Sequence, residues 1–329
     1  MQFTTPVYIS QRPFGLGFRD RLLLMGSCFA AEIGRRMTEG GLDAVVNPFG
    51  ILYNPVSIGS GLRRLMDEKL YEADDLCLHR GLFHSFDHHG SFSRPCLQEA
   101  LELINSRLRD GAGRLRSATR IVITWGNAVV FRRRDNDTVA GNCHKMPAGD
   151  FRRERLSVSD IVSLWQPLLQ DLRAINPDAR LILTVSPVRY LADGAHESNL
   201  AKSALLLAAD ELEREFDGFA TYFPAYEIML DELRDYRFYA PDMLHPSVQA
   251  IDYIWERFRD TYFAEEDRQL FREWEQIKKA LLHVPTNVDG ADYRRFIERT
   301  LQKVEEISRK FPYFDTSSER TLLHTIINQ

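Results

Sequence analysis

Short apolar runs alternate with helical patterns between residues 21 and 262. Three of these runs are apolar almost continuously up to a turn residue: RLLLMGS (21–27), RIVITWG (120–126) and RLILTVSP (180–187). Continuous apolar runs of this length are typical of strands that helices cover on both faces. Two further runs predict strands, LDAVVNPFG (42–50) and FATYFPAYEIM (219–229). The pattern therefore predicts five strands.

Helical periodicity follows several of these runs. After Ser27, apolar residues recur every fourth position at Phe29, Ile33 and Met37, and Gly40-Gly41 ends the pattern. Three further helices are predicted over residues 54–70, 157–176 and 199–216. Strands that alternate with helices in this order predict an α/β fold. We expect a three-layer sandwich with a mainly parallel five-stranded sheet, in a domain spanning residues 1–262.

The pattern changes after residue 263, where two amphipathic stripes are separated by VPTNVDG. The first stripe contains Leu270, Trp274, Ile277 and Leu281, and the second contains Tyr293, Ile297, Thr300, Val304, Ile307 and Phe311. This spacing predicts a C-terminal helical hairpin over residues 263–329. We favour packing of the stripes on the core or on each other. The alternative is a homodimer interface through these helices.

Composition narrows the class of protein. Of 329 residues, 44% are hydrophobic and 27% are charged, which excludes an intrinsically disordered chain. The formal net charge is −5 and no long run of one sign occurs, which argues against nucleic acid or an anionic membrane as the main partner. The N-terminal segment lacks a signal-peptide pattern and no segment approaches eighteen apolar residues, so we expect a cytoplasmic location.

Neither a metal motif nor a cofactor motif is present. The four cysteines form no CxxC pair, so a zinc ribbon or a redox dithiol is not predicted. No GxGxxG follows a strand and no GxxxxGK[ST] occurs. We therefore predict neither a cofactor nor a metal.

Ser27 lies where the first predicted strand becomes a helix. Ligands of open α/β sheets bind beyond the carboxyl ends of the strands, and helix N-terminal amides there can stabilise an oxyanion. Ser27 is therefore a candidate nucleophile, although a serine at this place can also simply cap the helix. The neighbouring Cys28 is a rival nucleophile or a small buried residue. The two point about 100° apart in a helix, so only one can face a reacting carbon.

The segment APDMLHPS (240–247) places Asp242 three residues before His245, on a proline-flanked loop. A histidine there can reach a nucleophile on another strand, and the aspartate can fix its tautomer. The alternative is a helix cap beside a surface histidine. Together with Ser27, this pair predicts a nucleophile, a base and an orienting acid.

These segments resemble the SGNH (GDSL-like) hydrolases, and more closely the GSCFA family, whose name is the string at residues 26–30. The resemblance continues through NPFGILYNPVSI (47–58), FHSFDHHGSFS (83–93), TWGNAVVF (124–131), GNCHKMP (141–147), TVSPVRYLADG (184–194), ESNLAKS (197–203) and WEQIKKALLH (274–283). It implies that Ser27 is the nucleophile, His245 the general base and Asp242 its orienting partner.

The resemblance also implies an oxyanion hole. Gly50 matches the glycine whose amide binds the oxyanion, beside the amide of Ser27 itself. The SGNH third block is GxND, whereas this chain has Gly126-Asn127-Ala128-Val129, so the asparagine comes one place early and the aspartate is missing. Asn127 or Asn142 can fill the role of the side-chain donor, or neither does.

A polar region between these blocks supplies the candidate substrate-binding residues. The segment 79–93 contains four histidines, and its possible roles are, in order of preference, lining the substrate cleft, a solvated loop and a metal site. His89 belongs to it, and Asn142 and His144 form a donor-rich cluster further on. Arg189 follows the fourth strand, where its guanidinium can bind a carboxylate or phosphate, or form a structural ion pair.

We therefore expect a serine esterase that cleaves an O-acyl ester of a sugar or another small metabolite. One alternative is an O-acyltransferase that uses the same residues, with a sugar hydroxyl in place of water. The other is a binding protein of SGNH shape that has lost catalysis.

Overall fold

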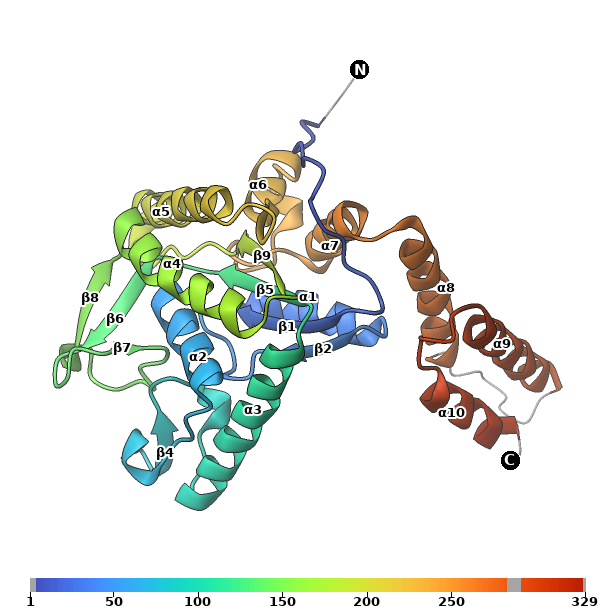
Figure 1. Cartoon of the computed structure of the whole chain (residues 1–329), viewed down its shortest axis with the longest axis horizontal. Helices are drawn as coiled ribbons and strands as arrows, with labels where there is room; N and C mark the ends of the chain where they lie inside the picture. The colour runs from blue at the N-terminus through green and yellow to red at the C-terminus, as the bar shows by residue number, and fades with distance from the viewer. Residues whose placement is uncertain (1–3, 283–290, 328–329) are drawn as a thin grey trace.

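The computed structural model describes residues 4–282 and 291–327, and a five-stranded parallel sheet forms its centre (Figure 1). In spatial order the strands are β10 (Ala220–Phe223), β9 (Arg180–Val185), β5 (Arg120–Trp125), β1 (Arg21–Gly26) and β2 (Asp43–Val46). All five lie in the predicted runs. Because the strands are parallel, their carboxyl ends lie along one edge of the sheet.

Helices cover both faces of the sheet, which confirms the predicted three-layer α/β architecture (Figure 1). Leu23 and Met25 of β1 pack toward one face, whereas Leu22 and Leu24 pack toward the other. The first face is covered by α2 (Pro55–Asp67), α3 (Leu97–Ser117), α4 (Val158–Ile175) and α5 (Gly194–Glu215). The second is covered by α1 (Cys28–Glu39) and α7 (Val248–Tyr262).

Two helix boundaries and one strand end differ from the prediction. Helix α2 ends at Asp67 because Glu68 adopts a left-handed conformation with φ 50°, and α5 begins at Gly194, five residues before the predicted start at Asn199. The run 219–229 is a strand only as far as Phe223. After Pro224, which has no amide hydrogen to donate, the chain continues as the short helix α6 (Ala225–Glu227) and one π-helical turn (Ile228–Glu232).

Outside the central sheet, the structure contains two small β-sheets that the sequence pattern does not predict. The first is a hairpin of β3 (Leu76–His79) and β4 (Leu82–Ser85), and the second is an antiparallel sheet of β6 (Val129–Arg133), β7 (Val139–Ala140) and β8 (Phe151–Arg155). Both are short and partly exposed, so they carry little of the apolar periodicity that reveals the central strands. In Figure 1 they lie on the side of the molecule away from the C-terminal helices.

The C-terminal segment packs on the core. It forms α8 (Glu265–Leu281), α9 (Ala291–Lys310) and α10 (Ser317–Ile327), so a third helix joins the predicted hairpin (Figure 1). The break predicted at VPTNVDG falls outside the described residues. Trp274 of the first stripe and Val304 of the second belong to the same apolar cluster as Leu22 of β1, which confirms the packing of the stripes on the core. No helix in the described chain is long and apolar enough to cross a membrane.

Candidate active site

Ser27 lies at the carboxyl end of the central strand β1, one residue before α1 begins. Gly26 precedes it with φ +146°, and a Cβ there would lie 2.2 Å from the carbonyl oxygen of Thr124 on β5. Only glycine permits this close approach. The side-chain Oδ1 of Asn47 accepts a hydrogen bond from the Gly26 amide at 2.8 Å. The backbone before Ser27 is therefore fixed by contacts with both neighbouring strands.

The hydroxyl of Ser27 is not used as a helix cap. Although Ser27 occupies the N-cap position, its side chain accepts no hydrogen bond from the first turn of α1. The residue is only 1% exposed, and Oγ has no hydrogen-bond partner among the described residues. No acidic residue lies in the first turn of α1, so no side-chain charge there offsets the positive end of the helix beside Ser27. The capping role that a serine at this place can have is therefore not observed.

Cys28 is poorly suited to be the nucleophile. Burial raises the pKa of its thiol above the ordinary value of 9.0, and the backbone amides of Phe29 and Cys28 offset this only in part. A cysteine nucleophile needs a lowered pKa, because the thiolate is the reactive form. The structure gives Cys28 the opposite shift.

Asp242 and His245 form the pair that their spacing predicts. The Asp242 Oδ2 lies 2.6 Å from Nδ1 of His245, and Oδ1 accepts hydrogen bonds from the amides of Leu244 and His245 at 2.9 and 3.0 Å. These two amides and the imidazole lower the pKa of Asp242 to about 2. The cap of α7 is Ser247, whose side chain accepts from Ala250. The aspartate therefore stays ionised and orients the ring.

The structure does not join His245 to Ser27. Ser27 Oγ has no hydrogen-bond partner in the part of the chain that the structure describes, whereas both members of the Asp242–His245 pair are about half exposed. The loop that carries His245 contacts the turn after β9, at the carboxyl end of that strand. There the backbone amide of Arg189 donates to the carbonyl of Leu244 at 3.1 Å. His245 and Ser27 thus both lie at the carboxyl edge of the sheet, without direct contact.

Lys202 anchors this edge and was missed by the sequence reasoning, which gave it no role. Its Nζ donates to the carbonyl oxygens of Gly126 at 2.7 Å and Ser186 at 2.6 Å, the residues that follow β5 and β9. A Cβ on Gly126 would lie 3.3 Å from the Cβ of Ser27. Burial lowers the pKa of Lys202 to about 7, and the charge of Arg189 adds to this.

A signal for Lys202 exists in the sequence. It lies four residues after Ser198 and three before Leu205, and all three belong to the buried face of α5. A lysine in the apolar stripe of a helix has to find polar partners inside the protein. Here they are the two carbonyl oxygens at the strand ends.

The expected oxyanion donors are only partly available. The amide of Ser27 donates to the carbonyl of Thr124 at 3.2 Å, and the amide of Gly50 donates to Asn47 at 2.8 Å. The geometry therefore does not leave these two backbone amides free to bind an oxyanion. Asn127 follows Gly126 beside Ser27, and its Oδ1 accepts from the amide of Val129 at 3.2 Å. Its side-chain NH2 makes no hydrogen bond to any described residue.

The histidines around residues 79–93 are mostly structural. His84 bonds Ser93 through Nδ1 at 2.6 Å, and His88 bonds Ser85 through Nδ1 at 2.9 Å. Burial lowers the pKa of His88 to about 3. These two buried rings are not part of a solvated loop. Among the described residues, no cluster of histidine, cysteine, aspartate or glutamate has the arrangement to hold a metal ion.

The other predicted binding residues divide into two groups. His144 is buried, its Nε2 is bonded to the carbonyl of Ser85 at 2.8 Å, and burial lowers its pKa, so its ring serves the local fold. His89 is half-buried and caps a short turn, next to Gly50. The Oδ1 of Asn142 accepts from the amide of His144 at 2.8 Å. His89 and Asn142 remain partly accessible.

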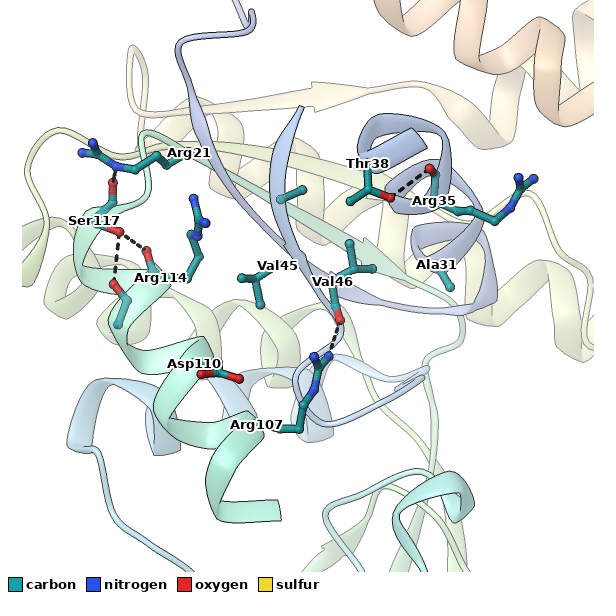
Figure 2. A pocket seen from close by; sticks show the side chains of 12 residues that line it. Arg21, Ala31, Arg35, Thr38, Val45, Val46, Arg107, Asp110, Arg114 and Ser117 are labelled. Atoms are coloured by element: carbon teal, nitrogen blue, oxygen red, sulfur yellow. Dashed lines mark hydrogen bonds between the residues drawn. The ribbon is translucent and has the colours of Figure 1, made fainter. Parts of the chain in front are cut away.

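A separate hollow of about 740 Å³ lies beside the edge strand β2, between α1 and α3 (Figure 2). Arg107 reaches the carbonyl of Val46 there, and Arg114 forms an ion pair with Asp43. Neither Ser27 nor His245 lines this hollow. It is therefore distinct from the candidate active site.

Two protein-family models match nearly the whole chain. The GSCFA family model matches residues 21–258, and the model for the C-terminal domain of GSCFA domain proteins matches residues 274–329. No curated protein matches the chain.

Among solved structures, the chain is similar to a family two carbohydrate esterase from Clostridium thermocellum in complex with cellohexaose, at 12% identity and a TM-score of 0.38, over 74% of this chain. It is also similar to an acetyl xylan esterase from the rumen bacterium Butyrivibrio proteoclasticus, at 12% identity and a TM-score of 0.36, over 78% of this chain. The match spans 64% of the length of each of these two esterases.

Proposed function

This chain belongs to the GSCFA family, and we propose that it is a serine esterase that cleaves an O-acyl ester of a sugar or another small metabolite. The observation that carries the proposal is the hydroxyl of Ser27. It lies at the carboxyl end of the central strand, at the positive end of α1, and no described residue forms a hydrogen bond with it. The ionised Asp242 supports the second half of the proposal, because it orients His245 on a neighbouring loop.

His245 is the general base in this mechanism. The ring approaches Ser27 when substrate binds, since catalytic hydrogen bonds often form only in the substrate complex. His245 Nε2 takes the hydroxyl proton as Ser27 Oγ attacks the acyl carbonyl, and Asp242 stabilises the resulting imidazolium. The same proton then passes to the leaving alcohol, which leaves an acyl group on Ser27. Water, deprotonated by His245, releases the acid and restores the hydroxyl.

The developing oxyanion needs donors that are not already used. The side-chain NH2 of Asn127 is such a donor, because only the Oδ1 of this residue is bonded within the described chain. Each donor of this kind contributes about 3 to 4 kcal/mol of transition-state stabilisation. Lys202 supports the arrangement through its bond to the carbonyl of Gly126, directly before Asn127.

One observation favours transfer of the acyl group as the second candidate function. Ser27 is 1% exposed, so almost none of its side chain is open to solvent in the described chain. A water-excluding site favours an acceptor hydroxyl over hydrolysis. Comparing acid release with acyl transfer to added sugars separates the esterase from the acyltransferase.

A fluorophosphonate probe tests the nucleophile. We expect the probe to modify Ser27, as mapped by mass spectrometry of the labelled peptide. Ser27→Ala should lose both labelling and ester cleavage, with cleavage reduced at least about 10³-fold. The matched control is Cys28→Ala, which should retain both. Full turnover by Ser27→Ala, or labelling at Cys28, would overturn the assignment.

A further inference from the structure

Arg189 lies at the same edge of the sheet, on the turn after β9. Its backbone amide donates to Leu244, next to His245. Its side chain is held by neutral groups, with Nη2 donating to Asn199 Oδ1 at 2.9 Å and Nε donating to Ser198 Oγ at 3.5 Å. Both partners belong to the first turns of α5. The guanidinium is therefore fixed in direction by contacts that leave its charge uncompensated.

No carboxylate within the described chain forms an ion pair with Arg189, so the structural ion pair that the sequence left open is not observed. The nearby acids have other partners: Asp193 pairs with Arg153, Glu197 with Arg155, and Asp242 with His245. A guanidinium without an ion-pair partner can bind a carboxylate or phosphate bidentately, because its planar fork of N–H donors matches their geometry. Two of the five N–H donors of Arg189 are used. The remaining three have no bond to a described residue.

The positive charge of Arg189 shifts the pKa of neighbouring side chains, one of which, Lys202, lies between Arg189 and the candidate nucleophile. After burial, it is the next cause that lowers the pKa of Lys202. Burial raises the pKa of Tyr226 and Tyr239, and the same guanidinium partly offsets this. Lys202 in turn bonds the carbonyl of Gly126, beside Ser27. Arg189 and the candidate nucleophile are thus connected through Lys202.

We propose that Arg189 binds an anionic group of the substrate, a carboxylate or a phosphate, so that the enzyme acts on anionic acyl esters in preference to neutral ones. The inference rests on the proposed esterase function and narrows its substrate class. The guanidinium binds the anion through its free donors while the ester carbonyl lies at Ser27. The anion supplies the charge partner that Arg189 lacks in the described chain.

Two matched pairs of esters test the proposal. The first pair places a carboxylate on the acyl side, mono-4-nitrophenyl succinate against its neutral methyl ester. The second places a phosphate on the alcohol side, 6-O-acetylglucose 1-phosphate against methyl 6-O-acetylglucoside. We expect the wild type to prefer the anionic member of at least one pair, which also identifies the side of the ester that carries the charge.

Substitution of the arginine should remove this preference. Arg189→Met should lower kcat/KM for the preferred anionic ester about 10- to 100-fold more than for its neutral partner. Arg189→Lys, which keeps the charge but loses the planar fork, should recover part of the loss. The matched control is Arg109→Met, because Arg109 is an exposed arginine of α3. It should keep the wild-type preference.

The outcomes separate this inference from the esterase function. Equal turnover of both members in both pairs, or a preference that survives in Arg189→Met, overturns the inference and leaves the esterase intact. If the wild type cleaves none of the four esters, calorimetric titration with succinate and inorganic phosphate decides. Binding that is lost in Arg189→Met then supports the anion site without the esterase, and absence of binding overturns it.

Discussion

Replacing Lys202 with methionine tests the buried anchor at the strand ends. Methionine has a similar length but carries neither charge nor donor. Lys202 is 2% exposed and bonds two carbonyl oxygens, of Gly126 and Ser186. Burial, together with the charge of Arg189, lowers its pKa from 10.5 to about 7. The substitution removes this titration from the folded protein.

The sign of the effect follows from proton binding. Between pH 7 and 10.5 the unfolded chain keeps the Lys202 proton and the folded chain releases it. The free energy of unfolding of the wild type therefore rises with pH, by about 1.4 kcal/mol per unit. Between pH 7 and 8.5 the gain is about 2 kcal/mol, and Lys202→Met lacks it. Below pH 7 the contribution of this group is constant.

Urea unfolding of both proteins at pH 6, 7, 7.75 and 8.5 measures the difference directly. Stopping at pH 8.5 keeps Cys28 protonated, since its pKa lies above 9.0. Lys303→Met, at an exposed position of α9, is the control, and its difference from the wild type should stay constant. A difference between wild type and Lys202→Met that is flat from pH 6 to 8.5 would refute the reasoning, because it would mean that the ammonium keeps the hydration of an exposed lysine.

Two further predictions concern the base and the loop after β2. Asp242→Asn should leave the fold intact but lower kcat about 10²- to 10⁴-fold, because the amide carries no charge to stabilise imidazolium. Circular dichroism checks the fold and steady-state kinetics measure kcat. An unchanged kcat would contradict the proposed role of Asp242. Gly50→Ala should destabilise the protein by more than Gly81→Ala in urea unfolding. Both glycines have positive φ, with an expected cost of about 1 to 2 kcal/mol, but only at Gly50 would the new Cβ meet another residue, His89 Cβ at 2.5 Å. Equal losses in the free energy of unfolding for the two variants would show that the loop after β2 moves to accommodate the new Cβ without loss of stability.

The sequence alone determined the sheet, because each central strand is covered on both faces and must therefore be apolar along its whole length. The run at 21–27 shows this most clearly, since every residue of β1 after Arg21 is buried. The same run located Ser27, because a strand that ends at a glycine and continues into a helix places the next residue at the sheet edge. The spacing of Asp242 and His245 likewise predicted their local pairing, which a three-residue separation is enough to form.

Only the tertiary structure decided which groups at that edge are free to react. The amides of Ser27 and Gly50 are engaged, the thiol of Cys28 has a raised pKa, and Lys202 bridges two strand ends. The partners that decide these states are mostly far away in the sequence, as Lys202 is from Gly126. Hydrophobic periodicity indicates which residues are buried, because buried positions recur with the period of the strand or helix that carries them. It carries no information about which distant carbonyl a buried donor meets, because that depends on how the strands and loops pack together.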